Sequence, residues 1–186
     1  MTQAGADGLA RTSEPRTVRR HRQLAVAATM VIVLVVAGAA LWLGGVRGGD
    51  LRLVVIDHDS GAVVYTRPVE IGERFVLEHT HSVTRRPIVE TFSVADEETI
   101  AIEELWFDEF GPNLPAGPEQ LGDHAEFLHE DGAFRVLHHG FPIGTVPLRV
   151  GSPAVDHVLT FSDDERVRLR DIARSGAWLD LVVRLG

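Results

Sequence analysis

The stretches FVLEHTHSV (75–83) and PIVETFSVA (87–95) decide the fold, because both alternate apolar and polar residues with the two-residue period of a β-strand. The polar segment Thr84-Arg85-Arg86 between them has the length of a hairpin connection. Such a pair of segments is typical of two antiparallel strands that share one apolar face. The sequence therefore predicts a β-hairpin at this place.

Similar segments continue on both sides of the hairpin, from residue 51 to residue 185, with turn residues between them. One helix is also possible, because Ser162 and Glu165 fit a capping box and Gly176 could end it. Residues 166–173 alternate as well, so a strand followed by one helical turn is the equal alternative. Many short strands at this spacing are typical of an antiparallel sandwich or a small barrel. We therefore expect residues 51–186 to form an all-β domain of about nine strands, with the choice between sandwich and barrel open.

A long apolar segment precedes this domain. Residues 24–43 contain no charge, and a helix of that length spans about 30 Å, the thickness of the bilayer core. We expect a single transmembrane helix that acts as an uncleaved signal anchor, with a cleaved signal peptide as the alternative. Residues 1–23 are expected to be a disordered tail, and residues 44–50 a flexible linker.

The charge distribution predicts the orientation and excludes one class of partner. Arginines cluster before the apolar segment, so the positive-inside rule places the N-terminus in the cytoplasm and the β-domain on the extracytoplasmic side of the cell membrane. From Asp50 onward, 25 acidic residues stand against 12 arginines, a formal charge of −13. Because such a surface repels phosphate backbones, we expect no nucleic-acid partner.

The composition and the motifs also argue against several kinds of chemistry. The chain has neither cysteine nor lysine, which excludes disulfide scaffolds, thiol nucleophiles and Schiff-base chemistry. The sequence contains no G-x-S-x-G, H-E-x-x-H or dinucleotide-binding motif. Our first expectation is therefore a protein that is not an enzyme and has neither a cofactor nor a metal centre.

Three ionisable residues lie on the apolar face of the predicted hairpin. His79 and His81 share that face on the first strand, and Glu90 is the carboxylate on the second. With a loop from Thr84 to Pro87, His81 lies opposite Glu90. A buried carboxylate needs a partner, so we expect an ion pair whose loss in Glu90→Ala destabilises the domain by roughly 2–4 kcal/mol.

Ser82 and His157 complete a candidate polar network with His81 and Glu90. His157 lies on the apolar face of its own segment, and Ser82 follows His81 directly. Three interpretations stay open. The network is structural, or it binds a metal or small ligand together with His79, or it activates Ser82 or a water molecule. Because neighbouring strand residues point to opposite faces, Ser82 as a nucleophile is disfavoured.

Several short motifs together resemble the domain-of-unknown-function family 1850. They are His81-Ser82-Val83 with Pro87 and Glu90, Phe110-Gly111 with Leu114-Pro115, and Leu148-Arg149-Val150-Gly151 leading to His157. That family comprises small extracytoplasmic proteins with an N-terminal hydrophobic segment, often encoded beside TRAP transporters of the TAXI type. Its members tend to have a Gly-Ala-Gly-Leu-Pro-like loop where this chain has Gly-Pro-Asn-Leu-Pro at 111–115.

The resemblance implies an accessory component of a TAXI-type TRAP solute transporter, with the permease and the solute-binding protein as partners. In this interpretation Gly111, Leu114 and Pro115, within the long segment 108–125, form the candidate partner loop. The alternative function is an extracytoplasmic domain that binds a metal or a small ligand at a site centred on His81, Glu90 and His157.

Overall fold

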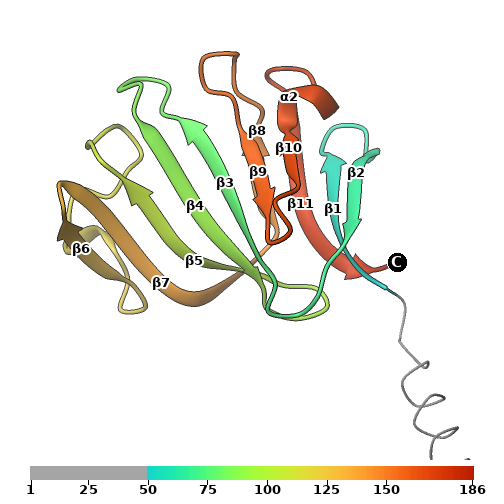
Figure 1. Cartoon of the computed structure of the whole chain (residues 1–186), viewed down its shortest axis with the longest axis horizontal. Helices are drawn as coiled ribbons and strands as arrows, with labels where there is room; N and C mark the ends of the chain where they lie inside the picture. The colour runs from blue at the N-terminus through green and yellow to red at the C-terminus, as the bar shows by residue number, and fades with distance from the viewer. Residues whose placement is uncertain (1–49) are drawn as a thin grey trace, which may run out of the picture. The chain divides into compact units, whose positions relative to one another are not determined.

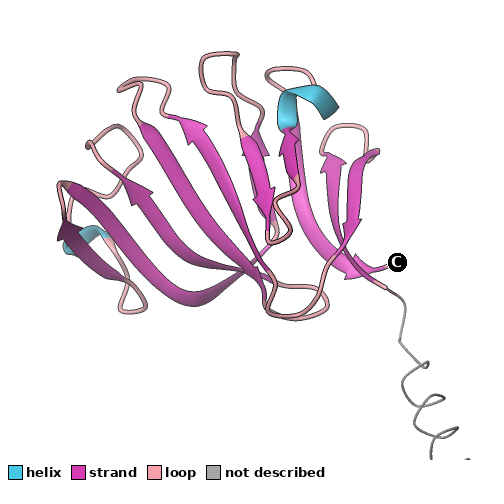
Figure 2. Ribbon diagram, viewed as in Figure 1, coloured by secondary structure: helices cyan, strands magenta, loops and turns pink. Residues whose placement is uncertain are grey.

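The computed structural model describes residues 50–186, and the expected tail and transmembrane segment lie outside the described residues. Residues 50–186 form two antiparallel sheets that pack face to face, so the predicted all-β class is confirmed as a sandwich (Figure 2). Within this range, no helix has the length and apolar character needed to cross a membrane.

Eleven strands and two short helices make up the described domain. The strands are β1 (Leu51–Asp57), β2 (Val63–Pro68), β3 (Arg74–Thr80), β4 (Pro87–Val94), β5 (Ile100–Phe107), β6 (Glu126–Glu130), β7 (Ala133–Gly144), β8 (Val146–Arg149), β9 (Val158–Phe161), β10 (Arg166–Arg168) and β11 (Trp178–Leu185). The helices are the 3-10 turn η1 (Pro118–Gln120) and α2 (Leu169–Ile172). The count exceeds the expected nine partly because residues 166–173 form both a strand and a helical turn.

The two sheets differ in size. Four strands pair in the order β2-β1-β11-β8, and seven pair in the order β10-β9-β3-β4-β5-β7-β6 (Figure 1). The first and last strands of the domain pair along their whole length, from Leu51 with Leu185 to Asp57 with Leu179. The two ends of the described domain therefore lie side by side.

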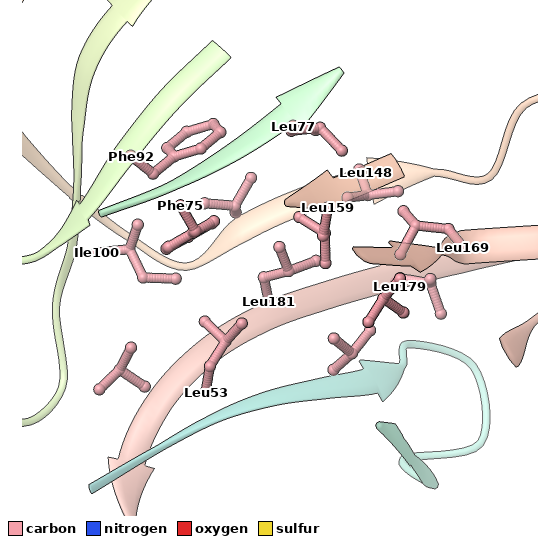
Figure 3. Close-up of a cluster of buried hydrophobic side chains, with 14 of the residues drawn as sticks. Leu53, Phe75, Leu77, Phe92, Ile100, Leu148, Leu159, Leu169, Leu179 and Leu181 are labelled. Carbon is pink, nitrogen blue, oxygen red and sulfur yellow. The ribbon is translucent and has the colours of Figure 1, made fainter. Parts of the chain in front are cut away.

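The main hydrophobic core lies between the sheets. Alternate residues of β11, including Leu179 and Leu181, are fully buried against the seven-stranded sheet. Figure 3 shows these leucines opposite Phe75 and Phe92, whose rings stack 5.4 Å apart. The period-two alternation that predicts the strands therefore also marks their buried faces.

A second, smaller core lies beyond the four-stranded sheet, where β5, β7 and β6 extend the large sheet to the left in Figure 1. Its fully buried members are Ile88, Phe107 and Val136. Leu114 and Leu121, from the segment 108–125 between β5 and β6, pack against them. That segment therefore covers the part of the sheet that the smaller sheet leaves open.

The register of the β3–β4 hairpin differs from the predicted one. His79 lies opposite Ile88, and Leu77, not His81, lies opposite Glu90. The strand β3 ends at Thr80, because the His81 amide donates to Arg86 O (2.8 Å) and closes a turn over 81–86. The observed register therefore differs from the predicted one by four residues. Because the shift is even, each side chain keeps its predicted face.

Candidate functional site

A cavity of about 960 Å³ lies where the two cores meet. It is bounded by the ends of β3 and β4, by β5, by residues 112–114, by the turn 150–157 after β8, and by the turn before β11. The ionisable residues in its lining are His79, His81, Glu90, Arg149 and His157. Ser82 also lines it, so the structure brings the whole candidate polar network to one cavity.

Glu90 is the inward-facing carboxylate of this cavity. Its neighbours across the sheet are Leu77 on β3 and Leu105 on β5, and Leu159 extends the same row on β9. No cation within residues 50–186 pairs with this carboxylate, and desolvation raises the pKa of Glu90 to about 7 from its ordinary value of 4.5. The predicted His81–Glu90 ion pair is therefore wrong, because the observed register separates the two residues.

His79 and His157 face each other beside this row, with ring centroids 4.7 Å apart. Burial is the main cause that lowers the pKa of His79 to about 4, and Coulombic repulsion from the neighbouring rings of His157 and His81, in their protonated forms, adds to it. Burial also lowers the pKa of His157, whose Nδ1 accepts a hydrogen bond from the Gly151 amide at 3.1 Å. Both imidazoles are therefore neutral at pH 7, and that of His157 carries its proton on Nε2.

His81 holds two loops together instead of pairing with Glu90. Its Nδ1 accepts hydrogen bonds from the backbone amides of Val83 (3.3 Å) and Thr84 (3.1 Å). A nitrogen that accepts carries no proton, so Nε2 is protonated and donates to Pro112 O at 3.0 Å. The ring of His81 thus joins the turn 81–86 to the segment 108–125, and both of its nitrogens are occupied.

Gly111 allows this close contact. A Cβ at position 111 would lie 2.8 Å from Cε1 of His81 and 3.0 Å from Cγ2 of Thr84. The neighbouring Asn113 has a left-handed backbone (φ 68°), a conformation that asparagine tolerates better than most residues. The glycine of this motif is therefore explained by packing against the ring of His81.

Replacing Gly111 by alanine is expected to destabilise the fold by roughly 1–3 kcal/mol, because the hydrogen-bonded ring of His81 cannot move aside freely. Gly117→Ala, in the same segment, is the matched control. The three atoms nearest to its Cβ would all belong to the flexible carboxylate of Glu119, which can move aside, so we expect a change within about 0.5 kcal/mol. Urea unfolding of both variants measures the difference, and equal stabilities would contradict the packing role of Gly111.

The other two residues of the candidate partner loop also face inward. Leu114 packs on the smaller core and lines the cavity. Pro115 lines a second, smaller cavity next to His138. Phe110 is exposed over 45% of its surface, although its ring lies tilted against that of Phe134, with the ring centroids 4.1 Å apart. The motif around Gly111 therefore forms one wall of the main cavity.

A second glycine shapes the opposite wall. A Cβ at Gly151 would lie 2.5 Å from Cβ of Val155 and 3.2 Å from Cε1 of His157. Together with the hydrogen bond from the Gly151 amide to Nδ1 of His157, this close contact places the motif at 148–151 directly against the ring of His157. Sequence reasoning missed Ser152, Ser175 and Gly176 as lining residues, because no local pattern marks these turns.

The donor groups of the cavity do not form a metal centre. Throughout residues 50–186, no group of three or more histidine, aspartate or glutamate side chains is arranged to hold a metal ion. The ring nitrogens of His81 are bound to backbone groups, which removes one of the predicted ligands. What converges in the cavity is two neutral imidazoles and one carboxyl group that has no cationic partner within the described part of the chain.

The comparisons with known proteins agree with the sequence motifs. Residues 75–169 match the model of a protein family described as a domain of unknown function (DUF1850). Among curated proteins and among solved structures, none matches the chain. The matched span runs from β3 to the start of α2 and contains nearly all of the cavity lining.

Proposed function

The chain belongs to the DUF1850 family, and we propose that its matched domain binds a small organic ligand in the cavity between its two cores. The observation that carries this proposal is the unpaired Glu90 carboxyl in the cavity lining. Natural ligand sites are typically concavities of roughly 300–1,000 Å³ with apolar walls and a few converging polar groups. The cavity has this size and this mixture of groups.

A fragment screen by ligand-observed NMR tests the proposal. Fragments should bind the full-length chain and lose binding in Ser152→Trp, which places an indole at the exposed rim of the cavity. Thr145→Trp is the matched control, because Thr145 is also exposed but does not line the cavity. Fragments that bind both variants equally, or no binding at all, would contradict a ligand site here.

We further propose that this domain is held outside the cytoplasm by the apolar segment 24–43. The chain contains no native cysteine, so the side of the membrane on which a residue lies can be tested by labelling a single introduced cysteine. A single cysteine at Thr145, which is exposed, should react with a membrane-impermeant maleimide on intact cells. A cysteine at Ser13 in the tail should react only after permeabilisation. The reverse pattern, or a soluble processed chain, would contradict the anchor.

As a second candidate function we propose an accessory component of a TAXI-type TRAP transporter, the role that the resemblance described in the sequence analysis implies. A domain tethered at the membrane gains effective concentration, so even a weak interface with the permease or the solute-binding protein would be populated. Both partners should co-purify with the tagged full-length chain in mild detergent. They should be absent when residues 1–49 alone carry the tag. Repeated failure to recover either partner would contradict this role.

A further inference from the structure

Glu90 gives the cavity a chemical preference. Resting on the binding function proposed above, we propose that the ligand carries an ammonium group, which pairs with the Glu90 carboxylate inside the cavity. A carboxylate removed from water is costly unless an opposite charge and hydrogen-bond donors compensate it. A primary ammonium supplies both, since it carries one positive charge and three donors in a small volume.

The surroundings of Glu90 leave this position open for a ligand. On both neighbouring strands the directly opposed residues are leucines, Leu77 and Leu105, which offer neither charge nor donor. Ile88 and Leu114 add further apolar lining. A short alkyl chain attached to the ammonium group would therefore contact apolar side chains while the charged end meets the carboxylate.

The other charged and titratable groups that line the cavity do not neutralise Glu90. His79 from β3 and His157 from the turn before β9 are neutral at pH 7, because burial lowers the pKa of both. His81 uses both ring nitrogens for backbone groups. Arg149 is exposed at the rim, where its Nε donates to Gly176 O at 3.2 Å. The segment 108–125 and β5 contribute no titratable group to the lining.

Pairing with a cation has a distinctive consequence. An opposite charge within about 4–6 Å typically lowers the pKa of a carboxyl group by roughly 1–3. Because the pKa of Glu90 is about 7 without a ligand, an ammonium ligand releases a proton on binding near neutral pH. Its affinity should therefore rise with pH up to about 7 and change little above it. An uncharged ligand does not need Glu90 to lose its proton, so its affinity should not rise in this way.

The test uses the full-length chain in detergent micelles, with ¹³C in the glutamate side-chain carboxyl groups. The Glu90 signal is identified by its loss in Glu90→Gln. Three probes of matched size are titrated, n-butylammonium chloride, n-butanol and sodium butyrate, with sodium chloride as the ionic-strength control. We expect n-butylammonium alone to lower the pKa of Glu90 by roughly 1–3. Ligand-observed NMR, which needs no Glu90 signal, measures its affinity in both proteins, and this affinity should fall roughly tenfold in Glu90→Gln.

The outcomes separate this inference from the binding function itself. If butanol or butyrate perturbs the Glu90 signal and n-butylammonium does not, the ligand class is wrong while the cavity remains a binding site. Binding of n-butylammonium that is equal in wild type and Glu90→Gln also overturns the inference. A Glu90 signal insensitive to every probe overturns it too, and the fragment screen then decides the binding function independently.

Discussion

Replacing Glu90 by glutamine is expected to stabilise the folded chain by about 3 kcal/mol at pH 8 and to change its stability little at pH 4.5. In the folded protein, desolvation raises the pKa of this carboxyl to about 7 from 4.5. The folded chain therefore binds more protons than the unfolded chain between these values. It follows that the free energy of unfolding of the wild type falls as the pH rises from about 4.5 to about 7.

Glutamine has the size of glutamate but does not ionise. The free energy of unfolding of Glu90→Gln therefore does not fall in this way as the pH rises. Urea unfolding of both proteins across pH 4.5–8 measures the difference in the free energy of unfolding. His79 and His157 also titrate abnormally, but both are present in both proteins, so their contribution to the difference largely cancels. A difference that stays constant with pH would show that Glu90 is solvated or paired, and would contradict the cavity described above.

His79→Phe is a control whose stability difference from the wild type should change with pH in the opposite direction. The pKa of His79 is lowered to about 4 from 6.5. Between pH 4 and pH 6.5, the unfolded chain therefore binds more protons than the folded chain. The stability conferred by neutral His79 is therefore lost as the pH falls from about 6.5 to about 4. Relative to the wild type, His79→Phe should gain stability on acidification, whereas Glu90→Gln gains stability as the pH rises.

Replacing Arg67 by methionine is expected to destabilise the fold by roughly 2–4 kcal/mol. Arg67 on β2 has only 11% of its side chain exposed and bonds to Glu73, itself 13% exposed, at 3.2 Å. Its guanidinium also bonds to Asp163 in the β9–β10 turn and lies 4.1 Å from the ring centroid of Phe161. Methionine would keep the packing on Phe161 but leave the Glu73 carboxylate without its cation.

Two comparisons make the Arg67 prediction specific. Arg166→Met removes an exposed arginine from its pair with Glu78 on the large sheet, and should cost less than about 1 kcal/mol. The double variant Arg67→Met/Glu73→Gln should recover part of the lost stability, because it removes the stranded charge. Urea unfolding measures all three variants. A cost for Arg67→Met no larger than that for Arg166→Met would show that Arg67 does not join the two sheets.

The inward position of the site residues could be predicted from the sequence, whereas their pairing could not. The alternation in 75–83 and 87–95 places His79 and Glu90 on the buried face, as observed. The same alternation is satisfied by any register that differs by an even number of residues. The turn 81–86, closed by backbone hydrogen bonds and a left-handed Arg85 (φ 63°), selects one register. Arginine is not a residue that signals this conformation.

By itself, the sequence determined the strands and their buried faces, because these depend on local periodicity. The motifs that contain Gly111, Gly151 and His157 indicated the family through their resemblance to it, and the family match confirms that assignment. Only the tertiary structure decided that Gly111 and Gly151 pack against His81 and His157, and that Glu90 lines a cavity in which no side chain of residues 50–186 pairs with it. The contact between Gly111 and His81 joins positions 30 residues apart, and the cavity lining extends from His79 to Gly176. Their geometry depends on how two sheets and one long connection pack together, which local alternation does not encode.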